Sequence, residues 1–487
     1  MKAYSSIDTK DYILYYAYAI VSVVCILLGF YFDQKVLLAF PFIAPLSVWA
    51  IVNFKSLYFF LLALIPLSME FDVTESLATD LPTEPLMAGF LLIALLYLIR
   101  HARKIDFSFF ANPLMVLLII HLTWLLIASI FSTVPLFSFK FMLAKWWYIS
   151  AFLLITAIVI RSIEDVKKVF WAIFIPLSAT VLMALIRHAM VGFDFDLINS
   201  VLRPFYRNHV NYAAILVIFL PFIVYARTWY PKYSAKYNLI ILSVIMYLVA
   251  IYFSYTRACY LAVLAMIGAY VVFKFKLTKP AVLIALIAVI FIGKFIVDQN
   301  HYLNYTPSTS TVSQHEFGDL VDATFKAEDV SSMERIYRWI AAVHMIGDRP
   351  IVGFGPNGFV ENYKNYTVFV FETWISDNEE RSGVHNYFLM TAVEQGLVGL
   401  FIFIALIIAV FVWGEKVLHL QQGNSKYLAQ AVLLSMMALL VNLLFSDMIE
   451  VDKTGSFFFF NIALLVLLSR NFKGLTQASE AIDGSKA

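Results

Sequence analysis

Arginine and histidine side chains gather in a single polar stretch of a chain that is otherwise mostly apolar. Residues 331–399 contain Arg335, Arg338, Arg349 and His385. Histidine is the side chain best suited to take a proton near neutral pH, and arginine binds phosphate through paired hydrogen bonds. A loop histidine can also serve packing alone, but His385 directly precedes an apolar span. These residue types therefore favour proton-transfer chemistry on a phosphate-bearing substrate.

Two arginines outside this stretch also adjoin apolar runs. Arg207 lies in LRPFYRNHVNYAAI, and Arg257 lies in SYTRACYLAV, in a short turn between two such runs. A guanidinium group stays charged, so an arginine at a membrane surface needs an anionic partner. No acidic residue adjoins Arg257 in the sequence. We expect a phosphate group to fill that role, with both arginines on the same side as the polar stretch.

The first part of the polar stretch has the pattern of an amphipathic helix. Ser331-x-x-Glu334 is a capping box, and apolar residues follow at helical spacing. The pattern predicts a helix over 332–346 lying on the membrane surface, with Trp339 beside the arginines. For Arg338 the alternative is interfacial snorkelling, in which only its stem contacts apolar surface.

A glycine-rich segment, GFGPNGF at 353–359, follows this helix and has the spacing GxGxxG. A dinucleotide site needs that spacing inside a strand–helix–strand unit, which is missing here. We therefore reject the dinucleotide interpretation. The segment is expected to form a tight turn that packs closely against a substrate or another segment.

The second part of the polar stretch ends in an apolar span. His385 and Asn386 stand at the mouth of this span, and Glu394 lies about two turns inside it. Carboxylates inside a membrane are costly and are functional candidates by default, although Glu394 could instead pair with an arginine to stabilise the fold. We find neither a DxD-type carboxylate motif in the polar stretch nor a Walker A motif. No metal and no cofactor is expected.

These residues must be positioned by membrane helices. Of the 487 residues, 62% are hydrophobic and 14% are charged, against about 25% charged in soluble domains. The apolar runs have the length that crosses a bilayer as helix. The sequence predicts an all-α polytopic membrane protein with 12–14 transmembrane helices and one large, partly helical extracytoplasmic loop. The segments 36–52 and 57–69 are either two short spans or one broken element.

The polar stretch divides the chain into four parts. We expect a helix bundle over 1–297, the extracytoplasmic loop over 298–386, further transmembrane helices over 387–470 and a cytoplasmic tail over 471–487. Lysine and arginine are concentrated in alternate connections, which places both termini inside and 298–386 outside. The net charge of +2 gives no reason to expect nucleic acid as a partner.

Several of these motifs, in this order, resemble those of the O-antigen ligase and polymerase superfamily. The matching elements are Arg335-x-x-x-Trp339, Pro350-x-x-Gly353-x-Gly355, His385-Asn386 and Glu394-x-Gly396-x-x-Gly399. RNHVNYAA and SYTRACYLA resemble two upstream segments of that family, each with one arginine at the outer face. The resemblance covers about 200–400, while the first 200 residues match only as a series of spans.

The resemblance implies a metal-independent glycosyltransferase of the bacterial inner membrane, acting at its periplasmic face. Its donor would be an undecaprenyl-diphosphate-linked glycan. Its acceptor would be a glycolipid of the lipid A-core type for a ligase, or another lipid-linked repeat unit for a polymerase. By position, Arg207, Arg257 and Arg335 would hold the diphosphate and His385 would act on the acceptor hydroxyl, with Arg338, Trp339, Asn386 and Glu394 in support. A lipid-linked oligosaccharide flippase is the alternative of another class.

Overall fold

A computed structural model describes residues 9–34, 37–38, 40–74, 77–297, 330–367 and 382–475. In this part of the chain, eleven helices are long and apolar enough to cross a membrane, and two shorter apolar helices cover Tyr15–Tyr31 and Thr278–Phe291. The prediction of an all-α polytopic membrane protein is therefore confirmed. The eleven are one fewer than the expected minimum of 12, and the expected range of 12–14 is reached only if the two shorter apolar helices also cross.

The elements follow one another along the chain with short connections. The first half contains α1 (Thr9–Tyr31), α2 (Phe40–Leu64), β1 (Met69–Thr74), β2 (Leu77–Leu81), α3 (Thr83–Arg100), α4 (Pro113–Ile130), α5 (Pro135–Ile149), α6 (Thr156–Val159), α7 (Ile163–Met190), α8 (Ile198–Leu202) and α9 (His209–Ala226). The second half contains α10 (Ala235–Tyr252), α11 (Arg257–Lys274), α12 (Thr278–Val297), α14 (Val330–Asp348), α15 (Gly358–Asn362), α16 (Tyr387–Leu420), α17 (Gly423–Leu443) and α18 (Asp452–Ser469). A π-helical turn, Ser150–Ile155, joins α5 to α6.

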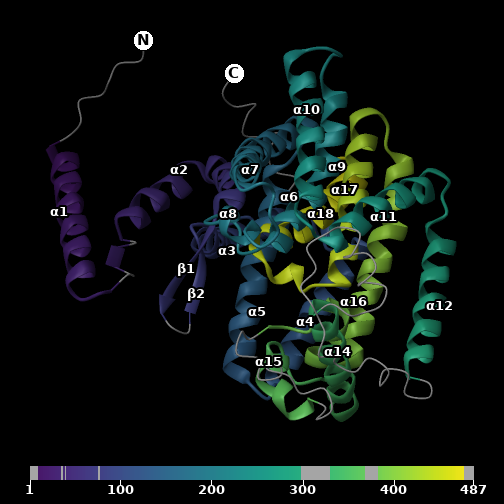
Figure 1. Cartoon of the computed structure of the whole chain (residues 1–487). Coiled ribbons are helices and arrows are strands. Elements are labelled where there is room, and N and C mark those ends of the chain that lie inside the picture. Colours follow the sequence, from purple (N-terminus) through teal and green to yellow (C-terminus); the bar gives the residue numbers. More distant parts are fainter. Residues whose placement is uncertain are drawn as a thin grey trace.

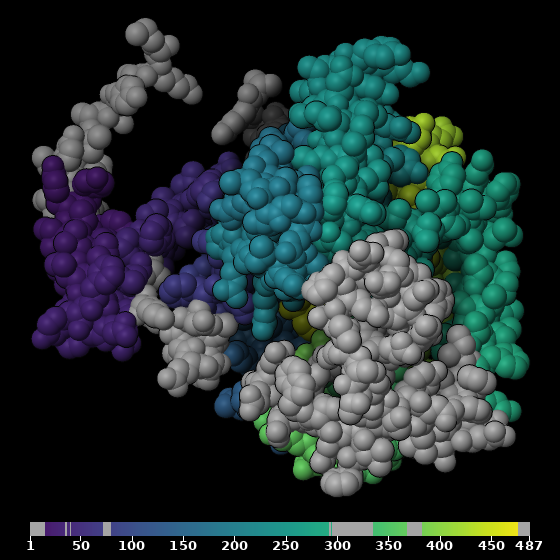
Figure 2. Space-filling view, viewed as in Figure 1, coloured from purple at the N-terminus to yellow at the C-terminus, as the bar shows by residue number. Residues whose placement is uncertain are grey.

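Three helices form the centre of the bundle. The apolar windows of α9, α17 and α18 are 72%, 78% and 94% buried, against 28% for α10 and α11. A helix that is apolar on all sides has to be surrounded by other helices or by lipid, and these three are surrounded by helices. Figure 1 shows them in the middle of the molecule, while α1 and α12 stand at opposite edges. In the space-filling view, the purple α1 and the teal α12 again stand at opposite edges (Figure 2).

The second expected span is a single bent helix. Asn53 interrupts α2 with φ −155° and ψ 76°, which are not helical values. The segments 36–52 and 57–69 are therefore parts of one broken element. This agrees with the second of the two interpretations of the sequence. The acidic connection after α2 is a hairpin that the sequence did not reveal, in which β1 and β2 pair antiparallel with Glu70 opposite Asp80.

The polar stretch lies at one end of the bundle, where α14 and α15 cover the ends of α4, α5 and α16 (Figure 1). Helix α14 spans Val330–Asp348, which confirms the helix predicted over 332–346. Helix α16 is broken at Gly396, whose φ of 69° and ψ of 179° are not helical. Residues 298–329 and 368–381 of the expected loop, and 476–487 of the expected tail, lie outside the described residues.

Candidate active site

His385 occupies a constrained position just before α16. Its backbone has a φ of 58°, in the left-handed region that few residues other than glycine adopt. Its Nε2 lies 2.9 Å from the hydroxyl of Ser382, and its backbone N–H donates to Oδ2 of Asp447 over 3.3 Å. The backbone strain and the two hydrogen bonds together define where the imidazole stands.

The surroundings keep the imidazole of His385 neutral. Burial, and to a smaller extent the positive charges of Arg335 and Arg338, together lower its pKa to about 4. Both causes disfavour the charged imidazolium. At pH 7 the ring is therefore uncharged and has a nitrogen lone pair with which to accept a proton.

Arg338 supports the segment that carries His385. Its side chain is 1% exposed, and Nη1 donates to the carbonyl oxygens of Ser382 at 2.8 Å and Gly383 at 3.2 Å. Its guanidinium carbon lies 5.2 Å from the ring centre of Tyr363. The snorkelling interpretation of Arg338 is wrong, because the side chain is turned into the protein and not toward the membrane surface.

Arg335 lies between two parts of the chain that are distant in sequence. Its charge acts on His385 and on His209, the first residue of α9. The hydroxyl of Thr256 donates to the carbonyl of His209 over 3.4 Å, and Arg257 follows directly as the first, half-buried residue of α11. The structure thus brings α14, His385 and the segment of Arg257 together. Trp339 is packed against the hydrophobic core.

Arg207 lies in a different setting from the other predicted site arginines. Its Nη1 lies 3.6 Å from the carboxylate of Glu70 in the hairpin, and its side chain is 67% exposed. Both residues line a cavity of about 590 Å³. The arginine is therefore already paired with a carboxylate at this end of the molecule.

The wall of this cavity is charged and internally bonded. It is formed by Glu70, Asp80, Arg203, Pro204, Phe205, Tyr206, Arg207, Asn211, Glu450, Val451, Asp452 and Lys453. Lys453 and Asp452 are both buried, with Nζ 3.8 Å from Oδ1. Burial and the charge of Asp452 raise the pKa of Asp80 to about 7. The cavity presents many hydrogen-bonding groups with little excess charge.

Glu450 connects the cavity with the His385 segment. Besides lining the cavity, its Oε1 accepts hydrogen bonds from Nζ of Lys145 at 2.6 Å and from the hydroxyl of Tyr387 at 2.9 Å. Tyr387 is the first residue of α16 and follows His385 by two positions. The cavity and the His385 centre are therefore neighbours that share a wall.

Asp447 is a site residue that sequence reasoning missed. Its Oδ2 accepts the N–H of His385, and its buried Oδ1 has no hydrogen-bond partner within the described residues. Burial raises its pKa to about 7, although the hydrogen bond with His385 and the charge of Arg338 oppose the rise. A Cβ on Gly383 would lie 2.3 Å from Oδ2, so only glycine permits this approach. The available signal was SDMIEVD, an acidic segment between two apolar spans.

Asn386 and Glu394 hold backbone in place. The side chain of Asn386 caps α16 by accepting the N–H groups of Phe388 and Leu389, both at 3.0 Å. Glu394 is 4% exposed, and backbone N–H groups of Asn357 and Phe359 bond to its carboxylate. It therefore fixes the glycine-rich segment at the break in α16.

The glycines allow this segment to touch α16. A Cβ on Gly353 would meet the carbonyl oxygen of Val393 at 2.5 Å, and one on Gly396 would lie only 2.0 Å from the carbonyl oxygen of Ile351. Both glycines also have positive φ values, 75° and 69°. Of the two expectations for the glycine-rich turn, the one that packs it against another segment is confirmed.

Comparison with protein families agrees with this geometry. Residues 241–404 match the family model described as O-antigen ligase. This match supports membership of the chain in the O-antigen ligase and polymerase superfamily. No curated protein matches the chain. The matched region includes Arg257, Arg335 and His385, while Arg207 and Asp447 lie outside it.

The family match supports a function of the O-antigen ligase or polymerase type. Its site offers a neutral imidazole, a nearby carboxylate and two guanidinium groups. This set can take a proton from a hydroxyl and stabilise a developing phosphate charge. Within the described residues, no group of three His, Cys, Asp or Glu stands where it could hold a metal ion. Metal independence stays a prediction.

Proposed function

We propose that this protein transfers a glycan from an undecaprenyl-diphosphate carrier to an acceptor hydroxyl, with His385 as the general base. The observation that carries the proposal is the neutral imidazole of His385, held beside Asp447 and under the charges of Arg335 and Arg338. A hydroxyl is a poor nucleophile until a base takes its proton. A diphosphate leaves readily once its negative charge is stabilised.

The reaction is a single displacement at the anomeric carbon. His385 takes the proton of the acceptor hydroxyl as its oxygen bonds to that carbon. The bond from the carbon to the diphosphate oxygen breaks, and its electron pair stays on the diphosphate. We assign the diphosphate to Arg257 and Arg335, with Arg207 at the rim of the cavity. Attack from the face opposite the leaving group inverts the anomeric centre, and no metal or cofactor takes part.

The charged cavity beside Glu450 suits the sugars of the substrate. Its carboxylates, Asn211 and the ring of Tyr206 supply the hydrogen bonds and apolar contact that hydroxyl-rich rings need. We place the reaction at the periplasmic face of a bacterial inner membrane and favour a ligase with an acceptor of the lipid A-core type. A repeat-unit polymerase of the same superfamily uses the same residues and stays the alternative.

Transfer by purified protein in detergent tests the proposal. Protein is given a defined undecaprenyl-diphosphate glycan with either a lipid A-core acceptor or a second lipid-linked repeat unit, each with and without EDTA. We expect donor consumption and glycan transfer that EDTA leaves unchanged. Product on the first acceptor identifies a ligase, and product on the second identifies a polymerase. A flippase needs no chemistry, so an intact donor in both reactions would contradict the proposal.

A further inference from the structure

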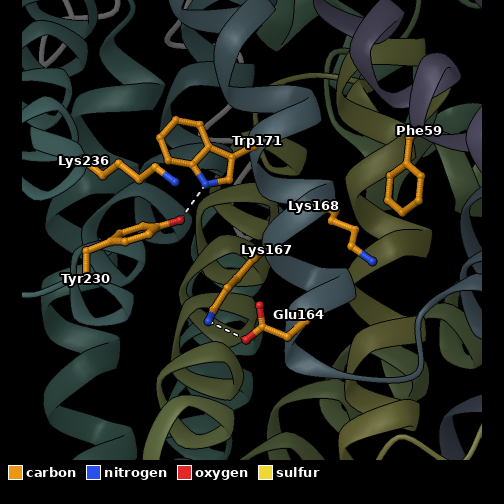
Figure 3. A pocket seen from close by; sticks show the side chains of 7 residues that line it. All are labelled: Phe59, Glu164, Lys167, Lys168, Trp171, Tyr230 and Lys236. Atoms are coloured by element: carbon orange, nitrogen blue, oxygen red, sulfur yellow. Dashed lines mark hydrogen bonds and ion pairs between the residues drawn. The ribbon is translucent and has the colours of Figure 1, made fainter.

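A second cavity lies at the end of the bundle away from the His385 site. It has a volume of about 610 Å³ and is lined by Phe59, Glu164, Lys167, Lys168, Trp171, Tyr230 and Lys236. These side chains come from α2, α7, the connection between α9 and α10, and the first turn of α10 (Figure 3). Figure 1 shows that connection and α14 at opposite ends of the molecule.

The length of α7 agrees with this separation. Its 28 residues extend about 42 Å as helix. Near its far end, Arg187 donates to the carbonyl of Arg203 over 2.8 Å, and Arg203 lines the charged cavity beside Glu450. Lys167 and Lys168, near its beginning, therefore stand a membrane thickness away from the proposed reaction.

The cavity combines cations with amphipathic rings. Lys236 Nζ lies 5.9 Å from the ring centre of Trp171 and 5.4 Å from that of Tyr230. The indole N–H of Trp171 donates to the hydroxyl of Tyr230 over 2.7 Å (Figure 3). Tryptophan and tyrosine with lysine are typical of the depth at which lipid headgroups lie. The pair thus holds the Lys236 ammonium at the cavity without neutralising it.

The three lysines differ in their partners. Lys167 pairs with Glu164 at 2.6 Å, and Lys168 pairs with Asp165 at 3.0 Å. In the part of the chain that the structure describes, no carboxylate pairs with Lys236, which is exposed. Lys236 is therefore the cation best able to bind an external anion, with the two paired lysines adding positive potential.

An exposed apolar stripe leads away from the cavity along α7. Ile175, Leu182 and Ile186 are 61%, 51% and 54% exposed. They follow Trp171 by 4, 11 and 15 residues, which places all four on one face of the helix. A hydrocarbon chain lying on this stripe would have its polar end at Lys236 and Trp171.

We propose that this cavity binds the phosphate-bearing headgroup of an anionic phospholipid, with an acyl chain along the stripe on α7. A free phosphate ion carries the same kind of negative charge, but it would not contact the aromatic rings or the apolar stripe. The site does not depend on the proposed reaction, because it lies at the other end of the bundle.

Lipid binding by the full-length protein tests the assignment. Delipidated protein in detergent is titrated with phosphatidylglycerol, phosphatidylcholine or inorganic phosphate, and bound ligand is counted by native mass spectrometry. We expect phosphatidylglycerol to bind most tightly. Lys236→Gln should weaken its Kd about fivefold, the equivalent of ~1 kcal/mol for a lysine near an anionic surface. Combining it with Lys167→Gln and Lys168→Gln should weaken the Kd about 100-fold.

Lys232→Gln is the matched control, because Lys232 is exposed just before α10, one turn away from Lys236 in sequence, and does not line the cavity. It should bind phosphatidylglycerol like the unmodified protein. An unchanged Kd for Lys236→Gln would overturn the proposal. Equal binding of phosphatidylcholine would do so as well, and phosphate binding as tight as that of the lipid would reduce the cavity to a free-anion site.

Discussion

The two polar regions at the α14 end of the molecule balance their charges in different ways. Around His385, the charges of Arg335 and Arg338 both act on the ring, and the neighbouring carboxylate, Asp447, has a pKa raised to about 7 and is only half ionised at neutral pH. Among the described residues, these positive charges outweigh the half-ionised carboxylate. This region is suited to a substrate that brings its own negative charge.

In the charged cavity next to it, cations stand beside carboxylates. Arg207 lies 3.6 Å from Glu70, and Lys453 lies 3.8 Å from Asp452. The cavity is therefore suited to uncharged polar groups such as sugar hydroxyls. We therefore expect the arginines near this face to differ, because the carboxylate of Glu70 beside Arg207 competes with an incoming phosphate.

The largest expected effect is at His385. His385→Gln keeps a hydrogen-bonding side chain and loses the base, so turnover should fall by about 10²–10⁴-fold while donor binding stays nearly unchanged. The turnover of His385→Ala should fall by a similar factor. Transfer and donor binding are measured separately on purified protein. His344→Gln is the control, because His344 is exposed on α14, and it should keep full activity.

A His385→Gln variant with normal transfer would assign His385 a packing role. The charged region would then bind the diphosphate without supplying the base, and Asp447 would be the titratable group left beside the reacting atoms.

The next largest effect should separate the two kinds of arginine. Arg257→Lys should lower kcat/KM for the donor about 10–100-fold, because lysine cannot form the paired hydrogen bonds of a guanidinium with phosphate. Arg207→Lys should cost at most about fivefold, since an exposed ion pair contributes ~1 kcal/mol or less. Arg257→Ala and Arg207→Ala should each lose more than the lysine variant at the same position.

Two further variants sharpen this comparison. Glu70→Gln should release Arg207 and tighten donor binding a few-fold, whereas Arg349→Lys, at an exposed position, should change nothing. Full activity of Arg257→Lys would remove Arg257 from the diphosphate site. Equal losses at Arg207 and Arg257 would show that the pairing with Glu70 does not persist when donor binds.

The sequence predicts the features that depend on local pattern. The amphipathic helix α14 and the tight glycine-rich turn both follow from residues within a few positions of one another. The short turn between α10 and α11 is also where the sequence predicts it, although Arg257 itself is the first residue of α11.

What the sequence does not show are pairings between distant segments. Asp447 contacts His385, which lies 62 positions earlier in the sequence. Glu70 contacts Arg207 because it lies in a β-hairpin, and the sequence of that hairpin has no recognisable hydrophobic pattern. The sequence of an amphipathic helix is compatible with snorkelling of Arg338. The side chain is buried only because the segment 382–384, more than 40 residues later, folds over it. Residues that act through long-range contacts thus need the fold before their roles can be assigned.

The smallest expected effect is the dependence of the rate on pH, and it tests how the positive region is balanced. With a pKa of about 4, His385 stays neutral above pH 6, so the supply of its basic form is nearly constant from pH 6 to 8. Asp447 loses its proton through about pH 7. The negative charge that appears strengthens His385 as a base, so kcat/KM should rise about two- to fivefold over this range, the effect of a charge worth ~1 kcal/mol.

In Asp447→Asn the rise should disappear while most activity remains, and below pH 4 both proteins should lose activity as His385 becomes protonated. If instead the rate climbs tenfold per pH unit toward 7 and Asp447→Asn is as inactive as His385→Gln, then Asp447 is the base and His385 positions it.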